Sequence, residues 1–225
     1  MKKILCIALI LFGCIGVFAQ EKTIEQSEFD AVYKNSLGKW GGKYRMTLTT
    51  QSSVEGRPQT DYSSKTTMEF ALPTGSRTIY ENSFGAKSTK TEKIRIGDKT
   101  YTRKEGEAWM EESSEAKSQP KDKSTSVEGD SQVEYKFLGS EKFNNQTANI
   151  YAKIAETKRI HPANNKETLS VATTKYWFGD GGIILKSDME MKSRTGEAIH
   201  YSRVTQIWES DPNIKIEAPD LSQIK

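Results

Sequence analysis

The side chains most often used in catalysis are sparse in this sequence. Its 225 residues include two histidines, His161 and His200, and two cysteines, Cys6 and Cys14. A Ser–His–Asp arrangement also needs a presented nucleophile, and no nucleophile-elbow motif is found. Metal sites need clustered histidine, cysteine or carboxylate ligands, and no such spacing occurs. The sequence therefore predicts no catalytic site, no metal and no cofactor, and a hydrolase is the weakest alternative.

Methionine and aromatic residues point instead to binding. Flexible methionines suit surfaces that accept variable apolar partners, and ligand hollows are mostly apolar. Ordinary core packing would produce the same composition. The residues that we expect to line a ligand hollow are Met46, Leu48, Met68, Phe70, Tyr80, Ile94, Tyr101, Trp109, Ile150 and Leu185.

Four basic residues lie close together in the middle of the chain. They are Lys87, Lys90, Lys93 and Arg95. Such a patch could hold phosphate or carboxylate headgroups at the mouth of a hollow. A solvated strand face would carry the same residues.

The first nineteen residues are typical of a secretory signal peptide. Lys2 and Lys3 precede a short apolar run, and the small residue Ala19 precedes Gln20. This order of charged, apolar and small residues predicts cleavage after Ala19 and a periplasmic or secreted protein. The alternative is a lipoprotein anchored through Cys14, because Leu11–Cys14 loosely resembles a lipobox.

Cleavage at Ala19 would change both the thiol content and the charge. It removes both cysteines, so the fold of residues 20–225 would contain no disulfide. It also lowers Lys+Arg from 33 to 31 against 30 acidic residues, which leaves about +1. A chain so close to neutral argues against nucleic acid as a partner. We expect a single-domain monomer with no transmembrane segment in the mature chain.

The pattern of apolar residues predicts one helix followed by a β-rich domain. Glu21–Leu37 has helical spacing, with Thr23 as its N-cap. After residue 42 the period changes to two, which is typical of strands with one buried face. The expected strands cover residues 43–49, 66–72, 77–81, 91–96, 99–103, 132–138, 146–157, 167–178, 182–194 and 197–209.

Turn residues divide these strands, and one long polar segment interrupts them. Gly97-Asp98 is typical of a two-residue hairpin turn, and Asn144-Asn145 predicts another. Residues 112–131 are rich in Ser, Lys, Glu and Asp, which predicts a mobile loop. About ten strands with short connections indicate one antiparallel sheet that must curl or close.

Three stretches resemble the LolA-like superfamily, which includes outer-membrane lipoprotein-sorting proteins and mycobacterial-type lipoproteins. They are Glu92–Arg103 with Trp109, Phe137–Tyr151, and Lys175–Gly182 with the strands up to Pro219. The resemblance implies an open half-barrel, a strongly curved antiparallel sheet with the N-terminal helix on its concave side. It also implies an apolar hollow for acyl chains. Leu72–Arg77 matches the carrier's Pro-x-x-Phe-Arg segment poorly, which favours a broader binder of apolar ligands.

Together these patterns favour an exported protein that binds a lipid or the acyl chain of a lipoprotein. The alternative is a module that docks onto an envelope protein partner through an exposed strand edge or apolar face. In that case its own side chains would fill the hollow and no ligand would bind.

Overall fold

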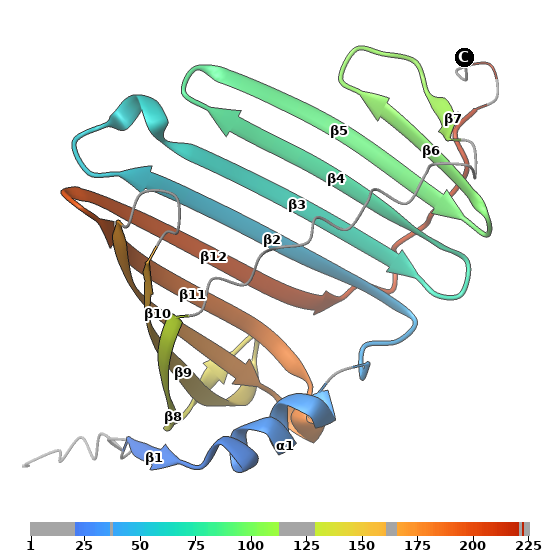
Figure 1. The fold of residues 1–225 in the computed structure, drawn as a ribbon. Coiled ribbons are helices and arrows are strands. Elements are labelled where there is room, and N and C mark those ends of the chain that lie inside the picture. The colour runs from blue at the N-terminus through green and yellow to red at the C-terminus, as the bar shows by residue number, and fades with distance from the viewer. Residues whose placement is uncertain (1–20, 37, 113–128, 161–165, 221, 223–225) are drawn as a thin grey trace, which may run out of the picture.

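The described part of the chain forms one large antiparallel sheet with one α-helix packed against it (Figure 1). The computed structural model describes residues 21–36, 38–112, 129–160, 166–220 and 222. The predicted signal peptide, with Cys6 and Cys14, therefore lies outside the described residues, and so does His161.

The helix α1 spans Gln26–Ser36, and two short 3-10 turns, η1 and η2, span Pro58–Thr60 and Asp180–Gly182. The strands are β1 (Lys22–Ile24), β2 (Lys43–Val54), β3 (Tyr62–Ala71), β4 (Gly75–Phe84), β5 (Lys87–Ile96), β6 (Lys99–Lys104), β7 (Met110–Glu112), β8 (Gly129–Phe143), β9 (Gln146–Ile160), β10 (Glu167–Phe178), β11 (Ile184–Thr195) and β12 (Ala198–Ser210).

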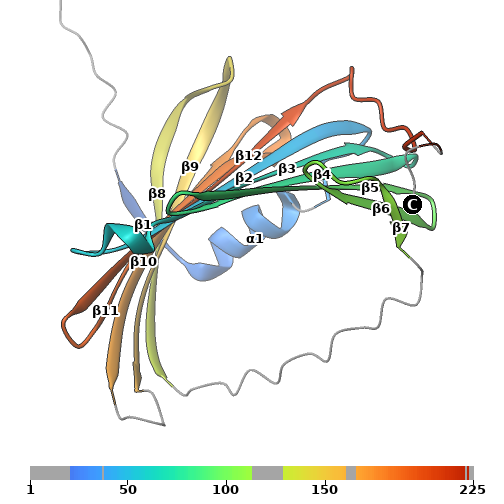
Figure 2. The same cartoon turned by 90° about the horizontal axis from the view of Figure 1, so that it is seen from above.

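The strands pair in the order β1-β8-β9-β10-β11-β12-β2-β3-β4-β5-β6-β7, each antiparallel to its neighbours. Strands β1 and β7 do not pair with each other, so the sheet stays open. Figure 2 shows a strong twist, in which β8–β11 cross the direction of β4–β6. The predicted curved, open antiparallel sheet is therefore confirmed.

Most predicted hairpins are present because their turns contain residues that tolerate positive φ. Gly97 has φ 58° between β5 and β6, and Asn144 and Asn145 have φ 48° and 64° between β8 and β9. The predicted end of a strand at residue 138 is wrong. Strand β8 continues through this position with a register shift between Phe137 and Gly139, because a β-bulge accommodates the extra residue.

The predicted start of the helix is also wrong. Residues 22–24 form β1, which pairs with β8, so Thr23 lies in a strand and does not cap the helix. The helix begins at Gln26, five residues after the predicted start, and the backbone N–H groups of Glu28 and Phe29 donate to the carbonyl of Glu25. Pairing with a distant strand has outweighed the local capping signal.

The two ends of the predicted mobile loop differ from the structure. Glu112 is the last residue of β7, and residues 129–131 begin β8. Residues 113–128 lie outside the described residues.

The helix covers one face of β8–β10. Phe29 is buried and lies 5.0 Å from the ring of Tyr135 and 5.4 Å from that of Tyr176, measured between centroids. Tyr33 stacks on Phe29, and Ile24 joins the same cluster. We call this side of the sheet the helix face. Successive cross-strand partners show that Leu48 on β2 lies on the same face as Tyr176 on β10.

The segment after β12 covers the opposite side of the sheet at its other end. Ile214 and Ile216 are buried against Tyr101 and Trp109, in a cluster that includes Ala71 and Ile94. The carboxylate of Asp211 lies 3.0 Å from the guanidinium of Arg45 and fixes the start of this tail. We call this side the tail face.

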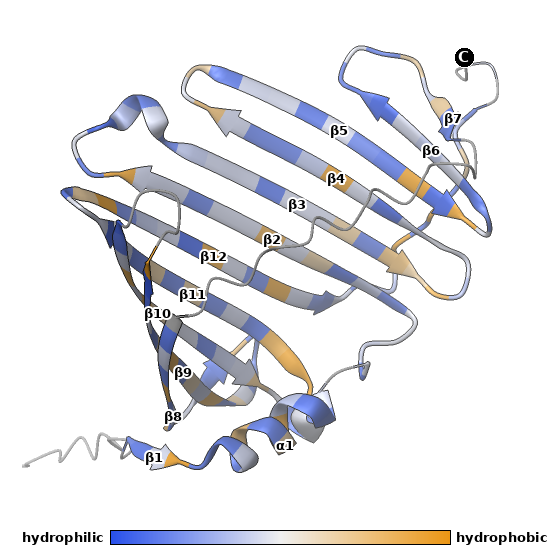
Figure 3. Ribbon diagram, viewed as in Figure 1, coloured by the Kyte–Doolittle hydropathy of each residue, from blue (hydrophilic) through white to orange (hydrophobic). Residues whose placement is uncertain are grey.

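A third cluster lies where the chain turns between β10 and β11. It contains Ala148, Ile150, Trp177 and Leu185, and Trp40 packs against it. In Figure 3 the central strands are mostly blue and white with short orange segments, so apolar residues do not form a continuous layer there. The described core is therefore three separate clusters.

Replacing Ile214 by Ala tests whether the tail is part of the fold. Ile214 is 4% exposed, and truncating a buried isoleucine costs about 2–5 kcal/mol of stability. We expect I214A to lower the free energy of unfolding by that amount in urea titrations. The control V133A changes a valine that is 42% exposed and should have little effect. Equal effects of the two substitutions would show that the tail contributes nothing to the core.

Candidate functional site

The ten residues predicted to line a ligand hollow do not share one face of the sheet. Five of them, Met46, Leu48, Met68, Phe70 and Tyr80, lie on the helix face. The other five are members of two core clusters: Ile94, Tyr101 and Trp109 beneath the tail, and Ile150 and Leu185 around Trp177.

The second group already has protein neighbours. These five side chains are between 3% and 8% exposed, whereas Tyr80 is 37% exposed. Met46, Leu48, Met68 and Phe70 are half-buried and belong to none of the three clusters. A ligand can therefore reach the first group without unfolding a cluster.

Four of the accessible residues form a compact apolar surface. Met46 pairs directly with Met68, and Leu48 and Phe70 continue the same face. We call Met46, Leu48, Met68 and Phe70 the apolar stripe. Directly paired side chains of neighbouring antiparallel strands lie close enough to act as one surface.

Aromatic rings border the stripe at the ends of β2 and β3 nearest the helix. Tyr44 stacks on Phe70 with 4.5 Å between ring centroids, and Trp40 lies 5.6 Å from Tyr44. Burial raises the pKa of the Tyr44 hydroxyl, as expected for a phenol beside apolar groups. Alternation in the sequence places Tyr44 on the same face as Met46, but Tyr44 is not among the ten residues predicted to line the hollow.

The stripe ends where the same face becomes hydroxylic. Beyond Leu48, the next residues of β2 on this face are Thr50 and Ser52, and Ser64 lies opposite Thr50 on β3. The apolar surface is thus confined to one end of the two strands. It is suited to desolvating a hydrocarbon group and offers no side chain for bond chemistry.

The tail face carries a ladder of alternating charges instead. The guanidinium of Arg45 lies 2.8 Å from the carboxylate of Glu69, and the guanidinium of Arg103 lies 2.8 Å from that of Glu92. Arg77 joins the two carboxylates from the strand between them. We call these five residues, Arg45, Glu69, Arg77, Glu92 and Arg103, the charge ladder.

Glu92 is the most buried member of the charge ladder, with its side chain 8% exposed. Burial alone would raise its pKa. Hydrogen bonds donated by Arg103 and Arg77 outweigh that effect and hold the pKa below the ordinary value of 4.5. A carboxylate so firmly ionised is poorly suited to act as a general acid, so the ladder serves the fold.

The predicted basic patch is divided in the structure. Lys87, Lys93 and Arg95 lie on the helix face, whereas Lys90 lies on the tail face. The amine of Lys93 lies 2.8 Å from the carboxylate of Glu112. The amine of Lys90 lies 3.3 Å from the carboxylate of Glu81. Acidic neighbours therefore offset two of the four charges.

Three further observations concern other kinds of function. His200 lies in β12 and is exposed. Within the described ranges, no three His, Cys, Asp or Glu side chains are grouped so that they could hold a metal ion. Nor does the described part of the chain contain a helix long and apolar enough to cross a membrane.

Comparisons with known proteins found matches among solved structures. No protein-family model and no curated protein matches the sequence. A LolA superfamily protein from Nitrosomonas europaea is 8% identical, with a TM-score of 0.28, and the match covers 89% of this chain and 97% of that one. A DUF1329 family protein from Desulfovibrio piger is 9% identical, with a TM-score of 0.29 and coverages of 84% and 94%.

Replacing Glu92 by Gln tests the charge ladder. Because the folded pKa is lowered, Glu92 stabilises the fold above its unfolded pKa, and this contribution is lost as pH falls through the folded pKa. Hydrogen bonds to charged groups contribute about 1.5–3 kcal/mol. We expect E92Q to lose about that much unfolding free energy at neutral pH and less in acid below 4.5.

The control is E81Q, since Glu81 forms an ion pair with Lys90 in which both side chains are more than 40% exposed. Exposed pairs contribute little, so its unfolding free energy should stay close to that of the wild type. A deficit of E92Q that is the same at neutral and acid pH would contradict the assignment.

Proposed function

We propose that this is an exported protein that binds a lipid, or the acyl chain of a lipoprotein, on the helix face of its sheet. The single observation that supports the proposal most is the apolar stripe. Its four side chains share one surface, remain half-buried and lie outside every described core cluster. An apolar partner would complete their burial.

The energetics of such binding need no chemical step. Each methylene that moves from water onto an apolar surface contributes about 0.8 kcal/mol. Roughly ten methylenes would supply about 8 kcal/mol, the binding free energy of a micromolar complex. Association and chain ordering subtract from this sum, so a longer acyl chain would be needed for the same affinity.

The composition of the stripe fits ligands of variable shape. Two of its four residues are methionines, which pair across β2 and β3. Unbranched, polarisable side chains adapt to different hydrocarbon shapes. We infer that the protein selects for apolar length more than for one chemical identity.

Export would place the protein in the cell envelope or outside the cell. Residues 1–19 have the order of a cleavable signal, and the near-neutral chain that follows offers no strong attraction for nucleic acid. An envelope location would bring the stripe into contact with lipids and acylated proteins. These two ligand sources share the same hydrocarbon chemistry.

Charged substitutions in the stripe test the proposal. With the fluorescent fatty acid dansyl-undecanoate as the probe, we expect M68E and L48E to bind at least tenfold more weakly than the wild type. The reason is that a carboxylate would have to be desolvated beneath the chain. Displacement of the probe by a phospholipid or by an acylated peptide then distinguishes the two ligand sources.

I160E is the control, because Ile160 is 51% exposed and ends β9, which is separated from β2 by three strands of the sheet. It should bind the probe like the wild type. If the wild type binds neither the probe nor either competitor, the protein has no apolar-ligand function. Retention of a defined envelope protein in that case would support the interaction module instead.

A further inference from the structure

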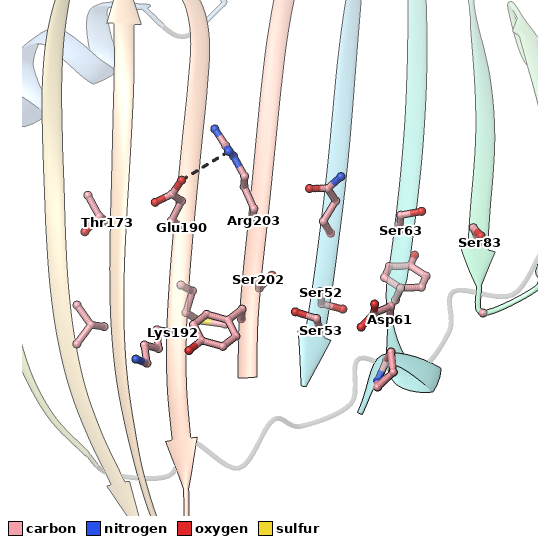
Figure 4. Close-up of a pocket in the computed structure, with 17 residues that line it drawn as sticks. Ser52, Ser53, Asp61, Ser63, Ser83, Thr173, Glu190, Lys192, Ser202 and Arg203 are labelled. Atoms are coloured by element: carbon pink, nitrogen blue, oxygen red, sulfur yellow. Dashed lines mark ion pairs between the residues drawn. The ribbon is translucent and has the colours of Figure 1, made fainter. Parts of the chain in front are cut away.

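A pocket of about 1050 Å³ lies at the end of the sheet away from the tail. Figure 4 shows the residues that line it, which come from several neighbouring strands, and we call this pocket the trough. Most of these side chains belong to the tail face, on the side opposite the helix and the apolar stripe. The hollow expected from the sequence was on the helix side, so this pocket is a separate feature.

One cross-strand row forms the floor of the trough. Each residue of the row is the register partner of the next, from β10 across β11, β12, β2 and β3 to β4. The row is Thr173, Glu190, Arg203, Gln51, Ser63 and Ser83. Cross-strand partners on one face lie side by side, so their polar groups form a continuous line.

Neutral hydrogen-bonding groups dominate this floor. Ser63, Ser83 and Thr173 carry hydroxyls, each able to donate one hydrogen bond and accept others, and Gln51 adds an amide. Ser53 and Ser202 line the same pocket. Such a surface matches a ligand that also presents hydroxyls as both donors and acceptors.

The charges in the pocket balance. Asp61 and Glu190 are acidic, and Lys192 and Arg203 are basic. Arg203 already pairs with two carboxylates. Its guanidinium lies 2.6 Å from the carboxylate of Asp188 and 3.7 Å from the carboxylate of Glu190. A pocket for a phosphate or a carboxylate would be expected to show excess positive charge. Charge complementarity therefore favours an uncharged ligand.

Apolar groups form part of the wall. Tyr201 is 39% exposed and Val171 is 45% exposed, and both line the pocket. The amine of Lys192 lies 5.4 Å from the centroid of the Tyr201 ring. The C–H face of a sugar ring is apolar while its rim is hydroxylic, so an aromatic wall beside a hydroxyl-lined floor matches both parts.

The trough extends beyond this first pocket. A second hollow of about 420 Å³ shares Gln51, Ser63 and Ser83 with it and continues to Ser88 on β5. Its charged residues also balance, since Lys65 and Lys90 are matched by Glu81 and Glu105. Small-molecule sites usually have volumes of roughly 300–1,000 Å³. With Ser88 the row crosses seven strands spaced about 4.8 Å apart, so the joint trough is long enough for a chain of sugar units.

We propose that this trough binds a neutral oligosaccharide. The site uses none of the residues of the apolar stripe and lies on the opposite face of the sheet. It therefore stands or falls independently of the proposed lipid-binding function.

Two variants test the site against a panel of linear neutral oligosaccharides of glucose, N-acetylglucosamine, galactose and mannose. We expect isothermal titration calorimetry of the full chain to find at least one binder. Y201A and Q51L should each weaken that binding at least tenfold, since they remove the aromatic wall and a floor amide. Both positions are exposed, and circular dichroism checks the fold of each variant.

Y80A is the matched control, because Tyr80 is 37% exposed, close to the 39% of Tyr201, but lies on the helix face. It should leave oligosaccharide binding unchanged. The proposal is overturned if no member of the panel binds, if Y80A weakens binding as much as Y201A, or if sulfated or phosphorylated sugars bind more tightly than neutral ones.

Discussion

The described residues form one open sheet of twelve strands, whose two faces must be either covered or made compatible with water. Among the described residues, α1 covers one face at β8–β10, and the tail covers the other face at β3–β7. The two covers lie on opposite sides and at opposite ends. Because neither covers the middle of β12 and β2, the described core is divided into clusters and the centre of the sheet remains accessible on both faces.

The accessible surfaces of the two faces carry different kinds of side chain. On the tail face, the charge ladder occupies the end beside the tail, and hydroxyls and balanced charges occupy the trough at the other end. The helix face is hydroxylic beyond Leu48. The four described side chains of the apolar stripe carry no polar group, and an accessible surface of this kind is a candidate binding surface. Lipid binding and oligosaccharide binding are therefore proposed for opposite faces of one layer.

Local patterns in the sequence predicted the hairpins well. Alternation and turn residues such as Gly97 and Asn144 act over a few residues and place most of the strands. The start of the helix could not be predicted in this way, because residues 22–24 are held by pairing with β8, more than a hundred residues later in the chain. The bulge near Gly139 likewise depends on the register with β9.

The placement of the candidate site residues could be predicted only in part for the same reason. Each apolar residue was correctly placed in or beside a strand, but the face of a residue such as Ile94 relative to Met68 depends on registers that accumulate over several pairings. The burial of Ile94 and Trp109 by the tail depends on where the last residues return. The hydroxyl trough has no local signal, because its row draws single residues from six strands.

Native mass spectrometry of the protein purified from a cell-envelope extract tests the central claim most directly. If an apolar ligand completes the burial of the stripe, the intact protein should carry an adduct with the mass of a lipid or an acylated fragment. Introducing a charge at Met68 should remove that adduct. A wild-type protein found only at its ligand-free mass, even after incubation with phospholipid and acylated peptide, would contradict the account.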